Sequence, residues 1–173
     1  MTTLHGTTFT LRPWRDTDIP SLVKYANNRA ISRNMRNIFP YPYTQKDAEW
    51  WIQTRKEDTS DNLFFAIEVD GEAVGGISCR VLEDVYFKGA EIGYWIGEPF
   101  WGRGIMSEVA SLFTDAAFAR LDIVRIEALV FGWNARSARV LENSGYHFEG
   151  RLERSVCKDG ELTDQLVYAR FRS

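Results

Sequence analysis

Hydrophobic and polar residues follow two periods along this chain. Alternation with period two, rich in β-branched and aromatic residues, predicts strands at residues 7–12, 64–69, 73–81, 90–96, 124–131, 146–157 and 162–171. Apolar residues at helical spacing predict helices from about residue 16 to 29, after the capping-box sequence at residues 44–47, from residue 104 onward, and over residues 134–143. The predicted order is therefore β-α-α-β-β-β-α-β-α-β-β.

Two glycine turns decide the type of sheet. Asp70-Gly71 and Lys158-Asp159-Gly160 each join neighbouring predicted strands and are typical of hairpins. Helices separate the other strands. Hairpins together with crossover helices predict an α/β fold of the α+β kind, in which a mixed sheet carries helices on its faces. They exclude a plain doubly wound parallel sheet.

Composition narrows the class of protein. The 173 residues fit one domain, so we expect residues 1–173 to form a single unit. With 45% hydrophobic and 26% charged residues, the chain is unlike disordered, collagen-like or coiled-coil sequences. Its apolar runs are too short to span a membrane and its start lacks signal-peptide features, so we expect a cytoplasmic protein without a membrane partner. The net charge of −3 argues against nucleic acid as a partner and weakly favours cationic or amine-bearing ligands.

The few cysteine and histidine residues do not suggest metal chemistry. Cys79 and Cys157 stand alone, without a Cys-x-x-Cys pair, and His5 is far from His147. No zinc site, other metal site or disulfide framework is therefore predicted. Both cysteines are expected to be small buried hydrophobic residues.

The densest chemical signal follows the predicted strand at residues 90–96. Gly102-Arg103-Gly104 opens a long helix, whose first amides have no partner within the helix and carry partial positive charge. Glycine lets the phosphates of a ligand come close to such amides. A P-loop would need Lys and then Ser or Thr where Ile105-Met106 stands, and a dinucleotide site would need glycine in place of Ser107. The diphosphate of coenzyme A remains as the candidate ligand.

Two segments carry a family resemblance. Trp101-Gly102-Arg103-Gly104-Ile105-Met106 resembles the acetyl-CoA loop of the GNAT N-acetyltransferase superfamily. The segment from Asn134 to Tyr146 resembles the Asn-x-x-Ser and Gly-Phe/Tyr motif of its ribosomal-protein (RimJ/RimL-like) branch. Trp101 departs from the usual Gln or Arg, and Met106 from the usual small residue. The resemblance implies the GNAT fold, with about seven strands and about four helices, and acetyl-CoA as co-substrate. It also admits a homodimer, which no residue pattern here demands.

The resemblance implies coenzyme-binding residues in both motifs and in the strand before the glycine turn. They are Tyr94, Trp95, Ile96, Trp101, Gly102, Arg103, Gly104, Ile105, Met106, Asn134 and Ser137. It further implies direct attack by an amine in a ternary complex. A backbone amide near Tyr94–Ile96 would stabilise the carbonyl oxygen, at the point where that strand splays from its parallel neighbour.

Two residues are candidates for catalysis, and each has a structural alternative that stays open. Glu91 is the candidate base for the amine, or else a strand charge that faces solvent or an arginine. Ser137 is the candidate acid for the leaving thiolate, because Leu141 occupies the place of the tyrosine that many relatives use. Alternatively, Ser137 serves only the first turn of a helix that Asn134 caps.

An aromatic stretch between the first two predicted helices lies where members of this family build the acceptor wall. Phe39, Tyr41 and Tyr43 alternate with two prolines, and we expect them to contact the amine substrate. The acceptor is either a protein N-terminal α-amine, which the branch favours, or a small amine such as a polyamine, an amino acid or an antibiotic. A non-catalytic module that binds acetyl-CoA is the third alternative.

Overall fold

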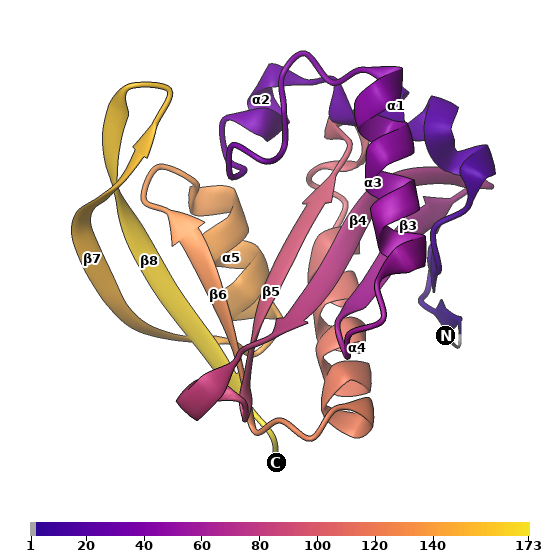
Figure 1. Ribbon diagram of the computed structural model, residues 1–173. Helices are drawn as coiled ribbons and strands as arrows, with labels where there is room; N and C mark the ends of the chain where they lie inside the picture. Colours follow the sequence, from indigo (N-terminus) through magenta and orange to yellow (C-terminus); the bar gives the residue numbers. More distant parts are fainter. Residues whose placement is uncertain (1–2) are drawn as a thin grey trace.

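The computed structural model describes residues 3–173 and contains one mixed sheet of eight strands (Figure 1). The strands are β1 (Leu4–His5), β2 (Thr10–Arg12), β3 (Leu63–Val69), β4 (Glu72–Val81), β5 (Gly89–Ile96), β6 (Arg125–Phe131), β7 (His147–Lys158) and β8 (Glu161–Phe171). They lie in the order β1-β2-β3-β4-β5-β6-β8-β7. Among these neighbours only β5 and β6 are parallel.

Five α-helices connect and cover the strands. They are α1 (Ile19–Ala26), α2 (Arg29–Ser32), α3 (Gln45–Glu57), α4 (Ile105–Arg120) and α5 (Ala135–Asn143). Short 3-10 helices occupy the connections at Asp16–Asp18, Asp84–Tyr86 and Glu98–Phe100. Within residues 3–173, no helix is long and apolar enough to cross a membrane.

Alternation along the strands sends their side chains to two separate cores. On β3, Phe65 and Ile67 pack with the apolar residues of α4 and α5, while Ala66 between them packs with α1 and α3. On β5, Ile92 and Trp95 divide in the same way. The sheet is thus a middle layer between two pairs of helices, and burial of apolar surface on both faces stabilises it at about 25 cal/mol per Å².

Local sequence signals fix where two of the helices begin. Thr44 caps α3, since its hydroxyl accepts a hydrogen bond from the Asp47 amide while the Asp47 carboxylate accepts one from the Thr44 amide at 2.7 Å. This is the capping box that the sequence predicts, with Asp in the place of Glu. Asn134 caps α5 by accepting a hydrogen bond from the Ser137 amide at 3.3 Å.

The first predicted strand is shorter than expected: of residues 7–12 only Thr10–Arg12 form a strand, β2, and the short strand β1 precedes the predicted range. The Gly6 amide donates to the Phe9 carbonyl at 2.9 Å and folds the residues between β1 and β2 into a turn. Thr7 donates through both its amide and its hydroxyl to Glu108 on α4. A threonine-rich alternation does not reveal this turn, because the long-range contact with α4 stabilises it.

The first predicted helix also differs from the expectation. α1 ends at Ala26, and Asn28 caps the short α2 by accepting from the Ala30 amide at 2.8 Å. The additional strand β1 and the additional helix α2 raise the totals to eight strands and five helices, against about seven and about four expected. The mixed sheet with helices on both faces is confirmed.

The expectation for the cysteines is correct for one of them. Cys79 on β4 is buried, and burial raises the pKa of its thiol to about 12. Cys157 is exposed instead, because it lies on β7 at the edge of the sheet, where no further strand or helix covers it.

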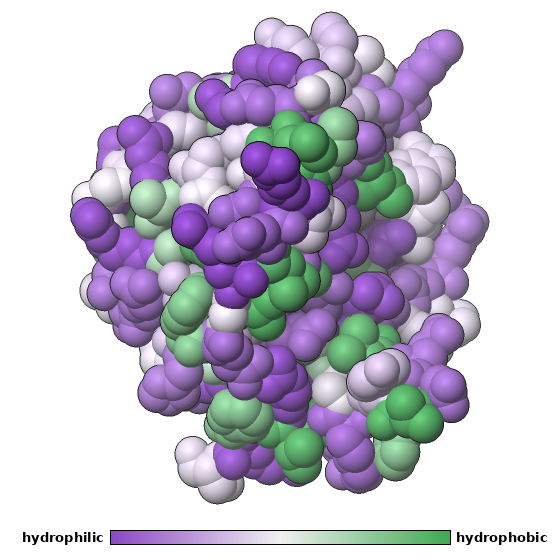
Figure 2. Space-filling view, turned by 90° about the vertical axis from the view of Figure 1, so that its left-hand side faces the viewer, coloured by the Kyte–Doolittle hydropathy of each residue, from purple (hydrophilic) through white to green (hydrophobic). Residues whose placement is uncertain are grey.

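The edge strand β7 carries charged side chains along most of its length. Glu149, Arg151, Glu153 and Arg154 are all exposed. Figure 2 views this side of the molecule and shows mainly hydrophilic side chains, with apolar ones in separate small groups. Charges of this kind discourage an edge strand from pairing with another chain.

Candidate active site

The parallel pair of β5 and β6 opens partway along its length. The two strands pair only over Gly89–Ile92 and Arg125–Ala128. Beyond these residues β5 still pairs with β4, and β6 with β8, so the two arrows diverge in Figure 1. The separation expected near Tyr94–Ile96 is therefore present. A cavity of about 1890 Å³ reaches into this opening and is lined by residues of both strands.

The edge of β5 that borders the opening presents backbone amides to it. Successive amides of a strand point to opposite sides. Because the Gly97 amide donates to the Val74 carbonyl on the β4 side at 2.8 Å, the amides of Tyr94 and Ile96 point toward β6, which no longer pairs there. A carbonyl oxygen of a ligand inserted between the strands would meet the Tyr94 amide.

The glycine turn borders the same cavity. Gly102 and Gly104 have φ of +72° and +76°, a region that favours glycine, and a Cβ at either position would meet no atom within 4 Å. In the part of the chain that the structure describes, no hydrogen bond engages the amides of residues 102–107. Ile105 and Met106 turn their side chains into the core, so the main chain faces the cavity. These open amides at the start of α4 fit a diphosphate.

Trp101 fastens this turn to the sheet. Its indole N–H donates to the Ile96 carbonyl at 2.8 Å, and the Arg136 guanidinium lies 4.8 Å from the centre of its ring. Arg103 lies over the Phe100 ring at 5.4 Å and is not among the residues that line the cavity. Trp101 therefore joins the end of β5 to the turn, a role that a shorter polar residue would not fill in the same way.

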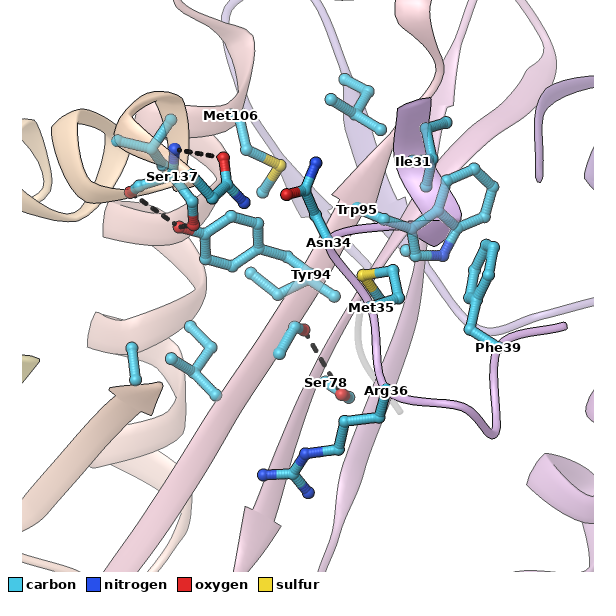
Figure 3. A pocket seen from close by; sticks show the side chains of 18 of the residues that line it. Ile31, Asn34, Met35, Arg36, Phe39, Ser78, Tyr94, Trp95, Met106 and Ser137 are labelled. Carbon is cyan, nitrogen blue, oxygen red and sulfur yellow. Dashed lines mark hydrogen bonds between the residues drawn. The ribbon is translucent and has the colours of Figure 1, made fainter. Parts of the chain in front are cut away.

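Three polar side chains meet beside the opening (Figure 3). The phenol of Tyr94 lies 2.8 Å from the Ser137 hydroxyl and 3.3 Å from the Ser137 carbonyl oxygen. Burial raises the pKa of the Tyr94 phenol, so the group stays neutral. The side-chain oxygen of Asn134 accepts from the Ser137 amide, so Asn134 caps α5 and also lines the cavity. Leu141 is fully buried, and its position offers no hydroxyl to the cavity.

Glu91 lines the cavity but is held by two arginines. Arg36 and Arg80 each donate to one oxygen of its carboxylate, the latter at 3.0 Å. The Glu91 side chain is 15% exposed, whereas those of Arg36 and Arg80 are 57% and 53% exposed. Glu91 is therefore paired with two arginines, and its oxygens lie behind their guanidinium groups.

The expected aromatic wall forms, without one of its three members. Phe39 lies 5.2 Å from Tyr43 and 5.5 Å from Trp95 between ring centres, and all three line the cavity. Tyr43 is nearly buried and belongs to the core on the α1 and α3 side. Tyr41 is 49% exposed and is not among the lining residues, because the chain turns it outward toward the Arg29 guanidinium. The position of Tyr41 does not support the expected contact with the acceptor.

The structure adds a segment that the sequence did not indicate as part of the site. Asn34, Met35 and Arg36, which follow α2, cross the cavity beside Ser78 and Trp95 (Figure 3). The Trp133 indole donates to the Asn34 side chain at 3.0 Å and ties this segment to the end of β6. No sequence signal marks these residues, because their partners lie on distant strands.

Comparison with known proteins supports this geometry. Residues 8–147 match the family model described as "Acetyltransferase (GNAT) domain". The relative named Probable N-acetyltransferase YjcK from Bacillus subtilis (strain 168) is 37% identical over 100 residues, which cover 58% of this chain and 55% of that protein. The chain therefore matches little more than half the length of this relative.

Two other relatives bear names of different acceptors. Ribosomal-protein-serine acetyltransferase from Escherichia coli (strain K12) is 29% identical over 107 residues, which cover 62% of this chain and 59% of that protein. Spermidine N(1)-acetyltransferase from the same strain is 23% identical over 162 residues, which cover 94% of this chain and 85% of that protein.

A solved structure shares the whole fold. RimL, described as a ribosomal L7/L12 alpha-N-protein acetyltransferase in complex with coenzyme A, superposes with a TM-score of 0.84 and 24% identity, over 98% of each chain. The family match, the opened strand pair and the glycine turn agree with one another. The chain belongs to the GNAT family of acetyl-CoA-dependent N-acetyltransferases.

Proposed function

We propose that this chain transfers the acetyl group of acetyl-CoA to the α-amine of a protein N-terminus. The supporting observation is that one cavity joins the open amides of the glycine turn, the unpaired edge of β5 and the face that carries Glu91. A donor and an acceptor that enter from opposite ends of this cavity meet between β5 and β6.

The residues around the turn are the proposed coenzyme site. The amides of Gly102 to Met106 bind the diphosphate, while Trp101 holds the turn. Ser137 and the main chain of Tyr94, Trp95 and Ile96 line the path of the thioester arm. Acetyl-CoA supplies the activated acyl group, and this chain places it.

The proposed reaction is a single attack. The uncharged amine attacks the thioester carbonyl carbon, so a C–N bond forms as the C–S bond breaks, and the thiolate of coenzyme A leaves. The Tyr94 amide stabilises the negative charge on the carbonyl oxygen. Glu91 takes the proton of the amine, through a water where the arginines stand between them. Ser137 donates a hydrogen bond to the leaving sulfur.

An α-amine suits a carboxylate that is bound by two arginines. Arg36 and Arg80 occupy both oxygens of the Glu91 carboxylate, which limits its access to the proton of an amine. An α-amine titrates near about 8 and is partly uncharged at neutral pH, whereas a lysine amine titrates near about 10.4. The α-amine needs less help from the base. The ribosomal-protein relatives support the same acceptor class, and the spermidine relative makes a polyamine the second candidate.

Release of free thiol from acetyl-CoA tests the proposed function. We expect release with N-terminal peptides that begin with Ala or Ser, and none when the same peptides are blocked at the amine. Binding of acetyl-CoA without release on any peptide or amine would instead assign a non-catalytic module.

The variant Gly104→Glu tests the coenzyme site. A side chain at this position projects into open space, where its bulk and charge would displace a diphosphate from the amides. We expect the variant to fold, with a strain of about 1–2 kcal/mol from the positive φ, and to lose acetyl-CoA binding in calorimetry. Gly71→Glu is the matched control, since Gly71 also has a positive φ and open space but lies in the β3–β4 turn. Normal acetyl-CoA binding by folded Gly104→Glu would refute the placement of the site.

The variant Glu91→Gln tests the base. We expect kcat to fall by about 10–100-fold and the KM for acetyl-CoA to change by less than about twofold. Glu127→Gln is the control, because Glu127 lies opposite Glu91 in the β5–β6 register, pairs with Arg125 and is not part of the cavity lining. If the pH–rate profile of Glu91→Gln matches that of the parent, Glu91 is not the base.

The hydroxyl pair is tested by Ser137→Ala and Tyr94→Phe. A thiol titrates near about 8.5, so its thiolate leaves readily and we expect Ser137→Ala to lower kcat by only about 3–10-fold. Because Tyr94 acts through Ser137, the double variant is expected to be no slower than Ser137→Ala alone. Additive losses would assign separate roles to the two residues. An unchanged kcat in Ser137→Ala would leave Ser137 with its helix-turn role only.

A further inference from the structure

The charge of the cavity is opposite in sign to that of the chain. The whole sequence carries a net charge of −3. The charged residues that line the cavity are the arginines Arg33, Arg36, Arg55, Arg80, Arg136 and Arg139 and the acids Asp47, Asp58, Glu91 and Glu98. Six positive and four negative groups give this surface a net charge of +2. Arg136 and Arg139 lie on α5 beside the proposed coenzyme site, so only the charges around Glu91 concern the acceptor.

All four acids of the lining are already bonded within the protein. Asp47 belongs to the capping box of α3, Asp58 accepts from Ser60, and Glu98 accepts from Asn28. Glu91 is the acid at the opening, and both of its oxygens are taken by Arg36 and Arg80. A cationic acceptor would find no acid in this lining without a partner.

The two arginines at Glu91 keep most of their hydrogen-bonding capacity. Each contributes one nitrogen to the carboxylate, while a guanidinium has five N–H donors. Both side chains are more than half exposed, and the group of two arginines and one glutamate has a net charge of +1. The adjacent Glu127 is bonded to Arg125, which also holds Glu149, and none of these three residues lines the cavity.

Glu91 and its two arginines lie close to the place where the proposed reaction would occur. Glu91 and Gly93 lie on the same face of β5, about 7 Å apart along the strand. Gly93 stands where the pairing with β6 has ended. Figure 3 shows Arg36 beside Ser78, whose hydroxyl donates to the Gly93 carbonyl at 3.3 Å. The two guanidinium groups are therefore bound to a carboxylate that lies two residues before Gly93 on β5.

We propose that Arg36 and Arg80 form an anion subsite, which selects an acceptor that carries a carboxylate or phosphate close to its amine. The inference rests on the proposed acetyl transfer and adds the chemical class of the acceptor. A guanidinium pair binds the planar carboxylate or the phosphate through charge-assisted hydrogen bonds. The same pair repels a polyamine, whose second and third ammonium groups would lie against the arginines.

Matched acceptors that differ only in the anion test this subsite on the parent protein. The pairs are an Ala-Glu and an Ala-Gln peptide amide, free alanine and alaninamide, and phosphoethanolamine and ethanolamine, with spermidine as the cationic acceptor. We expect kcat/KM to be about tenfold higher for the anionic member of at least one pair, and lowest for spermidine. The pair that responds distinguishes an acidic side chain, a free carboxylate and a phosphate as the source. Equal rates within every pair, or preference for spermidine, would overturn the proposal.

The variant Arg36→Gln/Arg80→Gln tests the same subsite through its side chains. We expect the anionic preference to fall from about tenfold to below about twofold, mainly through the KM of the acceptor. Because the preference is a ratio within one variant, a general loss of rate through Glu91 does not affect it. Arg151→Gln is the control, since Arg151 is 55% exposed and paired with Asp164 but is not among the lining residues. An undiminished preference in the double variant would refute the assignment to these arginines.

Two further measurements keep this proposal separate from the proposed function and from folding. If no acceptor releases thiol, the subsite is tested by calorimetry, which compares binding of the Ala-Glu peptide to the acetyl-CoA complexes of the parent protein and of the double variant. Weaker binding by the double variant supports it, and equal binding refutes it. If the double variant does not fold, the subsite is tested by the salt dependence of the anionic preference of the parent protein. The anionic preference is expected to shrink between 50 and 500 mM NaCl as screening increases, and a constant preference would refute a charged subsite.

Discussion

The loss of pairing between β5 and β6 beyond Ile92 and Ala128 is the constraint on which the rest of the site depends. Two parallel strands that separate in a protein interior leave backbone polar groups without partners unless another strand, water or a ligand bonds them. Here each strand keeps its other neighbour, β4 or β8, so only one edge of each is open. The Tyr94 and Ile96 amides face the gap, and the glycine turn follows directly at the end of β5. The gap places the open amides of β5 and those of the glycine turn in one cavity.

The connections around this gap hold it open. Trp101 bonds the turn to the Ile96 carbonyl, and Trp133 bonds the end of β6 to Asn34 in the segment that crosses the cavity. The hairpin of β7 and β8 contacts the chain on both sides of this segment. Asp159 of the hairpin pairs with Arg29, and Lys158 donates to the Asn37 side chain. Each strand end is therefore fixed by a side chain from another part of the chain.

Glu91 and its two arginines lie next to the point where the strands separate. Both carboxylate oxygens accept hydrogen bonds from Arg36 and Arg80, and both guanidinium groups keep further N–H donors. The residues that line the cavity carry a net charge of +2 in a chain whose net charge is −3, so the charge of the site is opposite in sign to that of the protein.

The sequence by itself determined the order of the main elements, the capping boxes and turns, and the glycine turn with its open amides. These depend on interactions between residues close in the chain, as at Thr44 and Asp47, or on the absence of a side chain, as at Gly102 and Gly104. Tertiary structure decided the turn before Thr10 that Glu108 stabilises, the outward orientation of Tyr41, and the pairing of Glu91 with Arg36 and Arg80. These features join segments that are distant in the chain, and hydrophobic periodicity carries no information about which distant charges will meet.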